Sequence, residues 1–187
     1  MNIFYLSHDV TECAKQHVDK HAVKMILEYA QLLSTAHRFL DGTQHIGRSP
    51  SGRKQTRYVL PDEREHLLYS ATHINHPSGI WVRKSADNYM WLSDLLRALC
   101  HEYTYRYGKV HKCERDGLMQ MLSERIPDNI QIDALFTEPT PAMPDEYKVS
   151  GSSIESYRKY YIGAKARMFN WKKRNMPEWI ENANIQI

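Results

Sequence analysis

The chain has 187 residues, 42% of them hydrophobic, and a net charge of +3. Its length suffices to bury one core, and no change in composition marks a boundary, so we expect one domain over residues 1–187. The three cysteines show no C-x-x-C spacing, and the sequence has neither an apolar leader nor 18 consecutive apolar residues. These features argue against a disulfide scaffold, a secreted protein and a membrane partner, so we expect a soluble, cytoplasmic protein. Nothing here indicates an oligomeric state.

The first strong pattern predicts a helix over residues 10–40, after possible caps at Ser7, His8 and Asp9. Its apolar residues recur with the alternating four-three spacing of one buried face. They are Val18, Ala22, Ile26, Tyr29, Leu33, Ala36 and Leu40. Asp41-Gly42 ends the helix, and the glycine-rich and serine-rich residues 43–60 predict an irregular loop or a hairpin.

Beside this apolar face runs a polar stripe of His17, His21, Lys24 and Glu28, spaced by four, three and four residues. At 100° per residue the four side chains fall within about 60° of one another. One interpretation is an ordinary ion pair of Lys24 with Glu28. The other is a site in which partial burial prepares the carboxylate to move protons and the lysine to hold an anion.

Four further helical segments and one long loop follow. Acidic residues after Pro61 predict a helix over residues 62–74, which ends before Pro77. A second long helix follows through Tyr89 to Tyr107 and breaks at Gly108. A shorter helix over residues 114–124, a proline-rich loop over residues 126–148 and a helix over residues 154–174 complete the chain. The prediction is a mainly α protein: a single compact helical domain built on two long helices with long irregular loops.

Two more clusters could carry chemistry. His73 and His76 could ligate a metal together with His17 and His21, although the spacing matches no standard zinc signature. Alternatively, Asn75 and His76 cap or end helices, or this turn borders a nucleotide pocket. Near the C-terminus, aromatic and basic residues alternate, which suits a nucleic-acid surface. We expect most of those rings in the core. The better ligand candidates are Arg158 and the run Lys172, Lys173 and Arg174.

In chain order, these blocks resemble the pyrimidine-dimer DNA glycosylases of the endonuclease V type. The resemblance rests on Lys20-x-x-x-Lys24-x-x-x-Glu28-x-x-Gln31-x-Leu33, on Asn75-His76-Pro77 with Trp81, on the helix carrying Glu102, and on Ser156-Tyr157-Arg158. It implies a helical DNA-repair glycosylase and lyase of phage-like origin, acting in the host cell. In that chemistry the N-terminal α-amine forms a Schiff base with the sugar of a flipped nucleotide, and a glutamate assists.

The resemblance makes Glu28, Lys24 and the α-amine of Met1 the catalytic candidates, because the bulky Asn2 favours retention of Met1. An α-amine has an ordinary pKa near 8, the lowest among protein amines. The candidates for contacting DNA or a nucleotide are His17, His21, Lys20, Asn75, His76, Arg158, Lys172, Lys173 and Arg174. This chemistry requires neither a cofactor nor a metal.

Two other hypotheses remain open. The first is a metal-dependent enzyme that modifies a nucleotide or base and uses the histidines at positions 17, 21, 73 and 76. The second is a non-catalytic nucleic-acid-binding module that uses the basic C-terminal helix alone.

Overall fold

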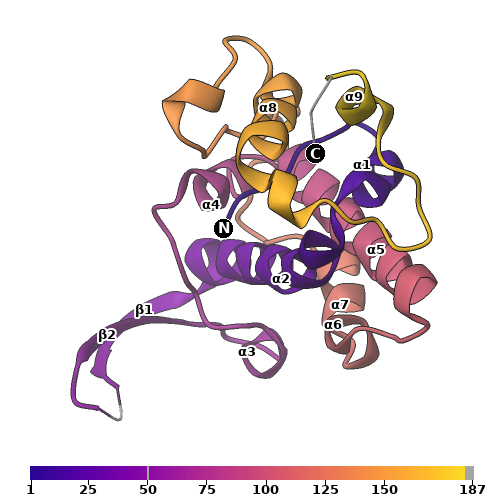
Figure 1. The fold of residues 1–187 in the computed structure, drawn as a ribbon. Coiled ribbons are helices and arrows are strands. Elements are labelled where there is room, and N and C mark those ends of the chain that lie inside the picture. The colour runs from indigo at the N-terminus through magenta and orange to yellow at the C-terminus, as the bar shows by residue number, and fades with distance from the viewer. Residues whose placement is uncertain (50, 184–187) are drawn as a thin grey trace.

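The computed structural model describes residues 1–49 and 51–183. Helices make up about 53% of the residues described and a small two-stranded sheet about 8%, which confirms the mainly α prediction. The two long helices are present as α2 (Asp19–Asp41) and α5 (Ala86–Tyr107), which pack against each other through the core (Figure 1). Gly108 ends α5 in the left-handed conformation, as its position predicts.

The predicted first helix is broken into two, and this part of the prediction is wrong. Helix α1 (Val10–Gln16) ends at His17, whose backbone is extended, and α2 begins at Asp19. The break is fixed by Arg106 of α5, which donates to the carbonyl oxygens of Lys15 and His17 at 2.9 Å each. Those carbonyls would otherwise accept bonds from the next turn of a continuous helix.

The sequence predicts an irregular loop or a hairpin over residues 43–60, and the structure shows the hairpin. Strand β1 (Thr43–Arg48) pairs antiparallel with β2 (Lys54–Val59), from Thr43 opposite Val59 to Arg48 opposite Lys54. The hairpin extends away from the helical body beyond the end of α2 (Figure 1). We call residues 43–59 the arm.

The predicted helix over residues 62–74 shrinks to α3 (Arg64–Leu67). Arg38 of α2 donates to the carbonyl oxygens of Glu65, Leu68 and Tyr69, so this stretch bonds to α2 rather than to its own next turn. A short helix, α4 (Pro77–Val82), then begins at Pro77. The ring nitrogen Nδ1 of His76 accepts a bond from the backbone N–H of Ser78, which confirms the capping alternative for this histidine.

The remaining elements are shorter than predicted. The predicted helix over residues 114–124 is α6 (Lys112–Arg115) and α7 (Leu118–Glu124), separated by Gly117 at a φ of 81°. The proline-rich stretch holds only the 3-10 turn η1 (Asp145–Tyr147). Helix α8 (Ser153–Lys165) ends nine residues before the predicted limit, at 165 rather than 174, and is followed by η2 (Ala166–Met168) and α9 (Glu178–Glu181). Within the described residues no helix has the length and apolarity needed to cross a bilayer.

Candidate functional site

Residues 3–6 lie inside the molecule, where they are fixed by buried polar groups. Ile3, Phe4, Tyr5 and Leu6 are at most 5% exposed. The Tyr29 hydroxyl of α2 accepts a hydrogen bond from the Phe4 N–H at 3.1 Å. The guanidinium of Arg158 donates twice to the Leu6 carbonyl oxygen, at 2.8 and 3.0 Å. The start of the chain is therefore anchored between α2 and α8 (Figure 1).

This anchoring places the α-amine of Met1 beside Glu28. The amine nitrogen lies 3.8 Å from Oε2 of Glu28, and the Lys24 ammonium contacts Oε1 at 3.1 Å. The Met1 side chain is only 5% exposed and the Glu28 side chain 15%, whereas Lys24 is 68% exposed. One carboxylate thus stands between two amines, of which the α-amine is the one held by packing.

The charges of Met1 and Glu28 also act on the imidazole of His76. Burial lowers its pKa, and the positive charge of the Met1 amine and of His73 lowers the pKa further, while the Glu28 carboxylate opposes the shift. The imidazole therefore shares an electrostatic environment with the amine and the carboxylate. Its position is fixed because the loop before α4 is tied to α2 by mutual hydrogen bonds between Thr35 and Thr72.

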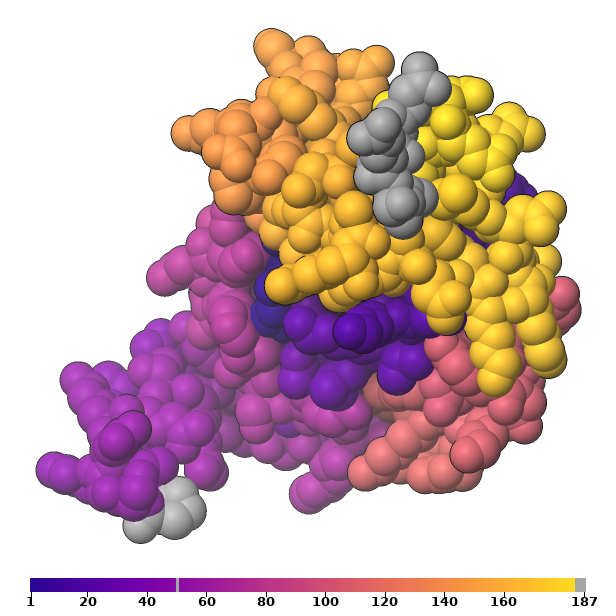
Figure 2. Space-filling model, viewed as in Figure 1, coloured from indigo at the N-terminus to yellow at the C-terminus, as the bar shows by residue number. Residues whose placement is uncertain are grey.

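The N-terminal residues and α2 are partly open to solvent on one side of the molecule. Figure 2 shows the N-terminal residues and α2, in indigo and violet, recessed between the C-terminal third and the loop leading into α4. The solvent-facing side of α2 combines cationic and apolar side chains, with Val23 at 39% and Leu27 at 41% exposure. Lys20 and Lys24 flank them. This combination suits a ligand with both an anionic and a hydrophobic part.

His17 and His21 do not reach this surface. His17 is fully buried, with Nδ1 against the Cys13 carbonyl oxygen at 2.7 Å and Nε2 against the Tyr29 hydroxyl at 3.1 Å. His21 bonds the Tyr161 hydroxyl through Nδ1 at 2.6 Å and stacks on Phe4. Because α1 ends at His17, the predicted four-residue stripe does not lie on one helix. His21, Lys24 and Glu28 do share α2, as the spacing predicts.

The four-histidine metal site is not assembled. Across residues 1–49 and 51–183, no three His, Cys, Asp or Glu side chains are grouped in a way that could hold a metal ion. Burial lowers the pKa of His17 to about 4 and that of His21 to about 3, and their ring nitrogens bond core partners instead.

The other predicted ligand residues are spread over several places. Arg158 uses its guanidinium on the backbone of Leu6 and lies over the Trp179 ring. Arg174 forms two bonds with the buried Glu102. Asn75, Lys172 and Lys173 are exposed. The backbone N–H of Lys172 donates to Asp19, so this basic run sits at the start of α2. It does not meet Glu28, two turns further along.

Sequence reasoning missed the residues that position the amine. Tyr29 was expected only as part of an apolar stripe, yet its hydroxyl joins Phe4 to His17. A tyrosine on a buried face signals that its hydroxyl needs a partner, but the partner is set by tertiary contacts. The same holds for Arg158, which was expected to face a ligand.

Comparisons with known proteins assign neither a family nor a function to this chain. No family model, no curated protein and no solved structure matches this chain.

Proposed function

We propose that the protein acts on the sugar of a damaged or abasic nucleotide in DNA through the α-amine of Met1. The observation that carries this proposal is the 3.8 Å separation between the Met1 amine and the partly exposed Glu28 carboxylate. An amine nucleophile needs a base to take its proton, and a nearby carboxylate can act directly or through one water. The resemblance to DNA glycosylases with lyase activity points to the same chemistry.

At an abasic site the steps balance without a cofactor. The neutral α-amine adds to the aldehyde carbon C1′, forming a C–N bond as the C=O π bond opens, and a proton from the attacking nitrogen passes to the carbonyl oxygen, which becomes a hydroxyl. Glu28, having accepted a proton from the amine, returns it to that hydroxyl, which leaves as water while the nitrogen lone pair forms the C1′=N⁺ iminium. The base-excision step of a glycosylase differs in its leaving group, since the C1′–base bond breaks and its electron pair departs with the base, which takes up a proton.

The neighbouring groups support Met1 rather than Lys24 as the nucleophile. Lysine amines have an ordinary pKa above 10, whereas α-amines have one near 8, so an α-amine is the easier to deprotonate. The Lys24 ammonium is exposed to solvent, while Met1 is held by its buried side chain. Lys24 is therefore assigned to the phosphate of the nucleotide, and His76 to the neighbourhood of the sugar.

The test is borohydride trapping on a duplex that contains one abasic site. Hydride reduces the iminium to a stable secondary amine, so the protein is expected to become covalently linked to the DNA, with the adduct mapping to Met1 by mass spectrometry. Intact mass of the untreated protein first verifies that Met1 is its terminal residue. Adding one glycine before Met1 is expected to abolish trapping.

Three substitutions sharpen the test. Glu28→Gln keeps the shape of the side chain and removes its proton transfer, and is expected to slow trapping about 100-fold. Glu12→Gln is the matched control, because Glu12 is also a helix carboxylate paired with a lysine one turn away. Lys24→Arg is expected to retain trapping. An adduct on Lys24, or DNA binding without any adduct, would refute the amine mechanism, and the second result would leave a nucleic-acid-binding module.

A further inference from the structure

The arm carries positive charge with nothing to neutralise it. Residues 43–60 contain no acidic side chain and four arginines or lysines, namely Arg48, Arg53, Lys54 and Arg57. All four are exposed, and none has an ion pair within the described residues. Both faces of the arm are open to solvent, and Ile46 near its middle is 65% exposed. The clearest packing contact of the arm with the helical body is that of the half-buried Tyr58 ring with Phe39 of α2.

The register of the strands places like charges opposite each other. Arg48 stands across from Lys54, and His45 stands across from Arg57. Since cross-strand partners share a face, one face of the arm carries the like charges of Arg48 and Lys54, and the other carries Arg57 opposite an imidazole. Like charges directly opposite destabilise an isolated hairpin, which favours a polyanionic partner that would offset the repulsion.

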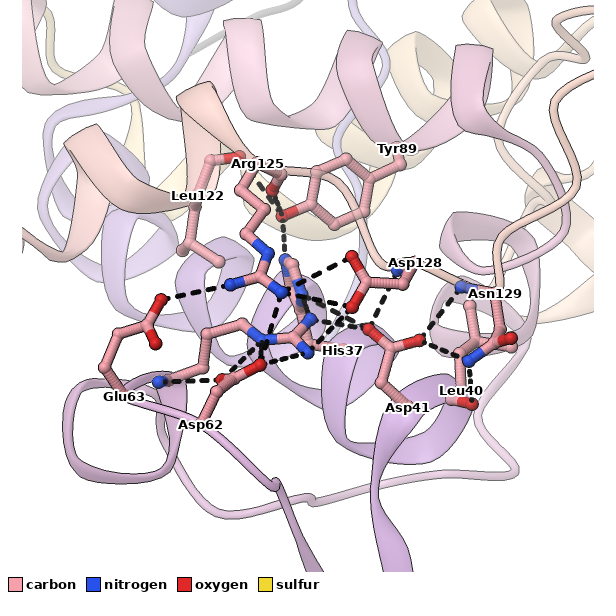
Figure 3. Close-up of polar contacts among 11 residues, drawn as sticks. His37, Leu40, Asp41, Asp62, Glu63, Tyr89, Leu122, Arg125, Asp128 and Asn129 are labelled. Atoms are coloured by element: carbon pink, nitrogen blue, oxygen red, sulfur yellow. Dashed lines mark hydrogen bonds and ion pairs between the residues drawn. The ribbon is translucent and has the colours of Figure 1, made fainter.

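The root of the arm is fixed by buried ion pairs on both sides. Asp41 just before β1 contacts Arg64 just after β2 at 2.6 Å, and Arg64 also contacts Asp62 at 2.7 Å. Figure 3 shows Asp41, Asp62 and Asp128 gathered there, with Arg125 and His37 beside them. Arg38 adds a bond to the Tyr58 carbonyl oxygen. The arm is therefore held in one direction at its base while its basic residues stay free.

From this geometry we propose that the arm is a DNA-binding β-ribbon that enters the major groove of a duplex. The major groove of B-form DNA, about 12 Å wide and 8.5 Å deep, admits a two-stranded ribbon. Six-residue strands reach about 20 Å, enough to cross the groove and contact phosphates on both sides. The major groove of an RNA duplex is deep and narrow, so side chains cannot read it. The partner that we propose for the arm is therefore a DNA duplex rather than an RNA duplex.

Helix α2 links the arm to the other basic residues. Its 23 residues span about 34 Å, close to one turn of B-form DNA. Lys172 is bonded to its first residue, Lys20 and Lys24 lie on its exposed side, and the arm follows its last residue. Figure 2 shows these regions on one face of the molecule. The arm thus lies about 20 Å along α2 from Glu28, the length of six base pairs.

The test measures binding to an intact 20-base-pair DNA duplex as a function of salt. The variant Arg48→Gln/Lys54→Gln/Arg57→Gln removes three cations from the arm without touching the core. Each lost phosphate contact is expected to reduce the slope of log K against log salt by about 0.9, hence by about 2.7 in total. Affinity near physiological salt is expected to fall at least tenfold.

The matched control is Arg97→Gln/Lys148→Gln/Lys159→Gln. It removes the same charge from α5, the turn after η1 and α8, all away from the arm, and it is expected to keep the wild-type slope. Equal effects of the two triple variants, an unchanged slope in the arm variant, or tighter binding of an RNA duplex of the same sequence would each overturn the proposal. The intact duplex carries no aldehyde, so failure of the amine chemistry leaves this result unaffected.

Discussion

Buried polar side chains, rather than apolar ones, fix the start of the chain. The Tyr29 hydroxyl bonds the Phe4 N–H and His17, while His21 bonds Tyr161 and stacks on Phe4. An imidazole can hold two partners only in one tautomer when neutral, and the charged form would have to be buried as an ion. The two histidines therefore act as neutral hydrogen-bonding groups, and the position of Met1 depends on their remaining uncharged.

This dependence predicts a loss of stability in mild acid. The pKa of His17 is lowered to about 4 and that of His21 to about 3, whereas an unfolded histidine titrates near 6.5. Between pH 6.5 and 4 the unfolded chain binds protons that the native state does not, so the free energy of unfolding falls as pH drops. His17 alone accounts for about 3 kcal/mol across that interval.

Chemical denaturation at pH 7 and at pH 4.5 checks this prediction. His17→Asn is expected to be less stable at pH 7 but to lose less stability on acidification. The control is His101→Asn, which removes an exposed imidazole from α5 and is expected to keep the wild-type dependence on pH. Identical pH dependence for wild type and His17→Asn would mean that the buried imidazole of His17 does not cause the loss of stability in acid.

At the scale of elements, local patterns were sufficient for the long helices but not for their ends. The four-three spacing predicted α2 because that face packs on α5, and the pair Lys24 and Glu28 followed from spacing alone. The break at His17 depends on Arg106, 89 residues away, and no local pattern encodes it. The resemblance to the glycosylases predicts that Met1 lies near Glu28. The same resemblance predicts that His21 contacts a ligand, and this prediction is wrong because His21 is buried.

Arg106 therefore controls an element boundary, and its substitution tests that role. Its guanidinium is fully buried and contacts Glu102, Asp19 and, at the break between α1 and α2, the carbonyl oxygens of Lys15 and His17. A lysine has one nitrogen and cannot span these positions. Arg106→Lys is expected to lower the free energy of unfolding by about 3 kcal/mol.

The control for this substitution lies on the same helix. Arg97→Lys retains an exposed cation beside Asp94 and is expected to change stability by less than about 0.5 kcal/mol. Both variants are compared by their denaturant midpoints, with slopes checked for two-state behaviour. If Arg106→Lys is as stable as Arg97→Lys, the break between α1 and α2 is not held by the guanidinium.

At the scale of the whole molecule, helix α2 carries both the site at Glu28 and the arm, and each end of this helix is tied to other elements. Asp19 joins α2 to Arg106 and to the backbone of Lys172, which closes the C-terminal segment onto the core. At the opposite end of α2, Asp41 joins Arg64 and the backbone N–H groups of residues 128 and 129. Both ends of α2 are thus tied to other elements through a carboxylate, and this one helix carries both the site and the arm.

The Arg64 network gives the last prediction. Burial by itself raises the pKa of Asp41, but the backbone N–H of Asp128 and the Arg64 guanidinium outweigh it and hold that pKa below its ordinary value. The Asp41 and Arg64 side chains are 3% and 1% exposed, so Arg64→Met strands a buried carboxylate and is expected to cost about 3 to 5 kcal/mol.

Adding Asp41→Asn to Arg64→Met is expected to restore part of that loss, because asparagine removes the stranded charge while its side-chain oxygen still accepts from the Asn129 N–H. Asp41→Asn alone is expected to destabilise, because it leaves Arg64 with one anion fewer. Asp41→Asn thus lowers the free energy of unfolding in the wild type but raises it in Arg64→Met. This change of sign, measured by chemical denaturation at pH 7 in a double-mutant cycle, shows that the pair Asp41 and Arg64 acts as an electrostatic clamp rather than through packing alone. If the clamp holds the arm, Arg64→Met also speeds amide hydrogen exchange in β1 and β2 before the core opens. Additive losses with unchanged exchange in the arm would show that the arm is held by other contacts.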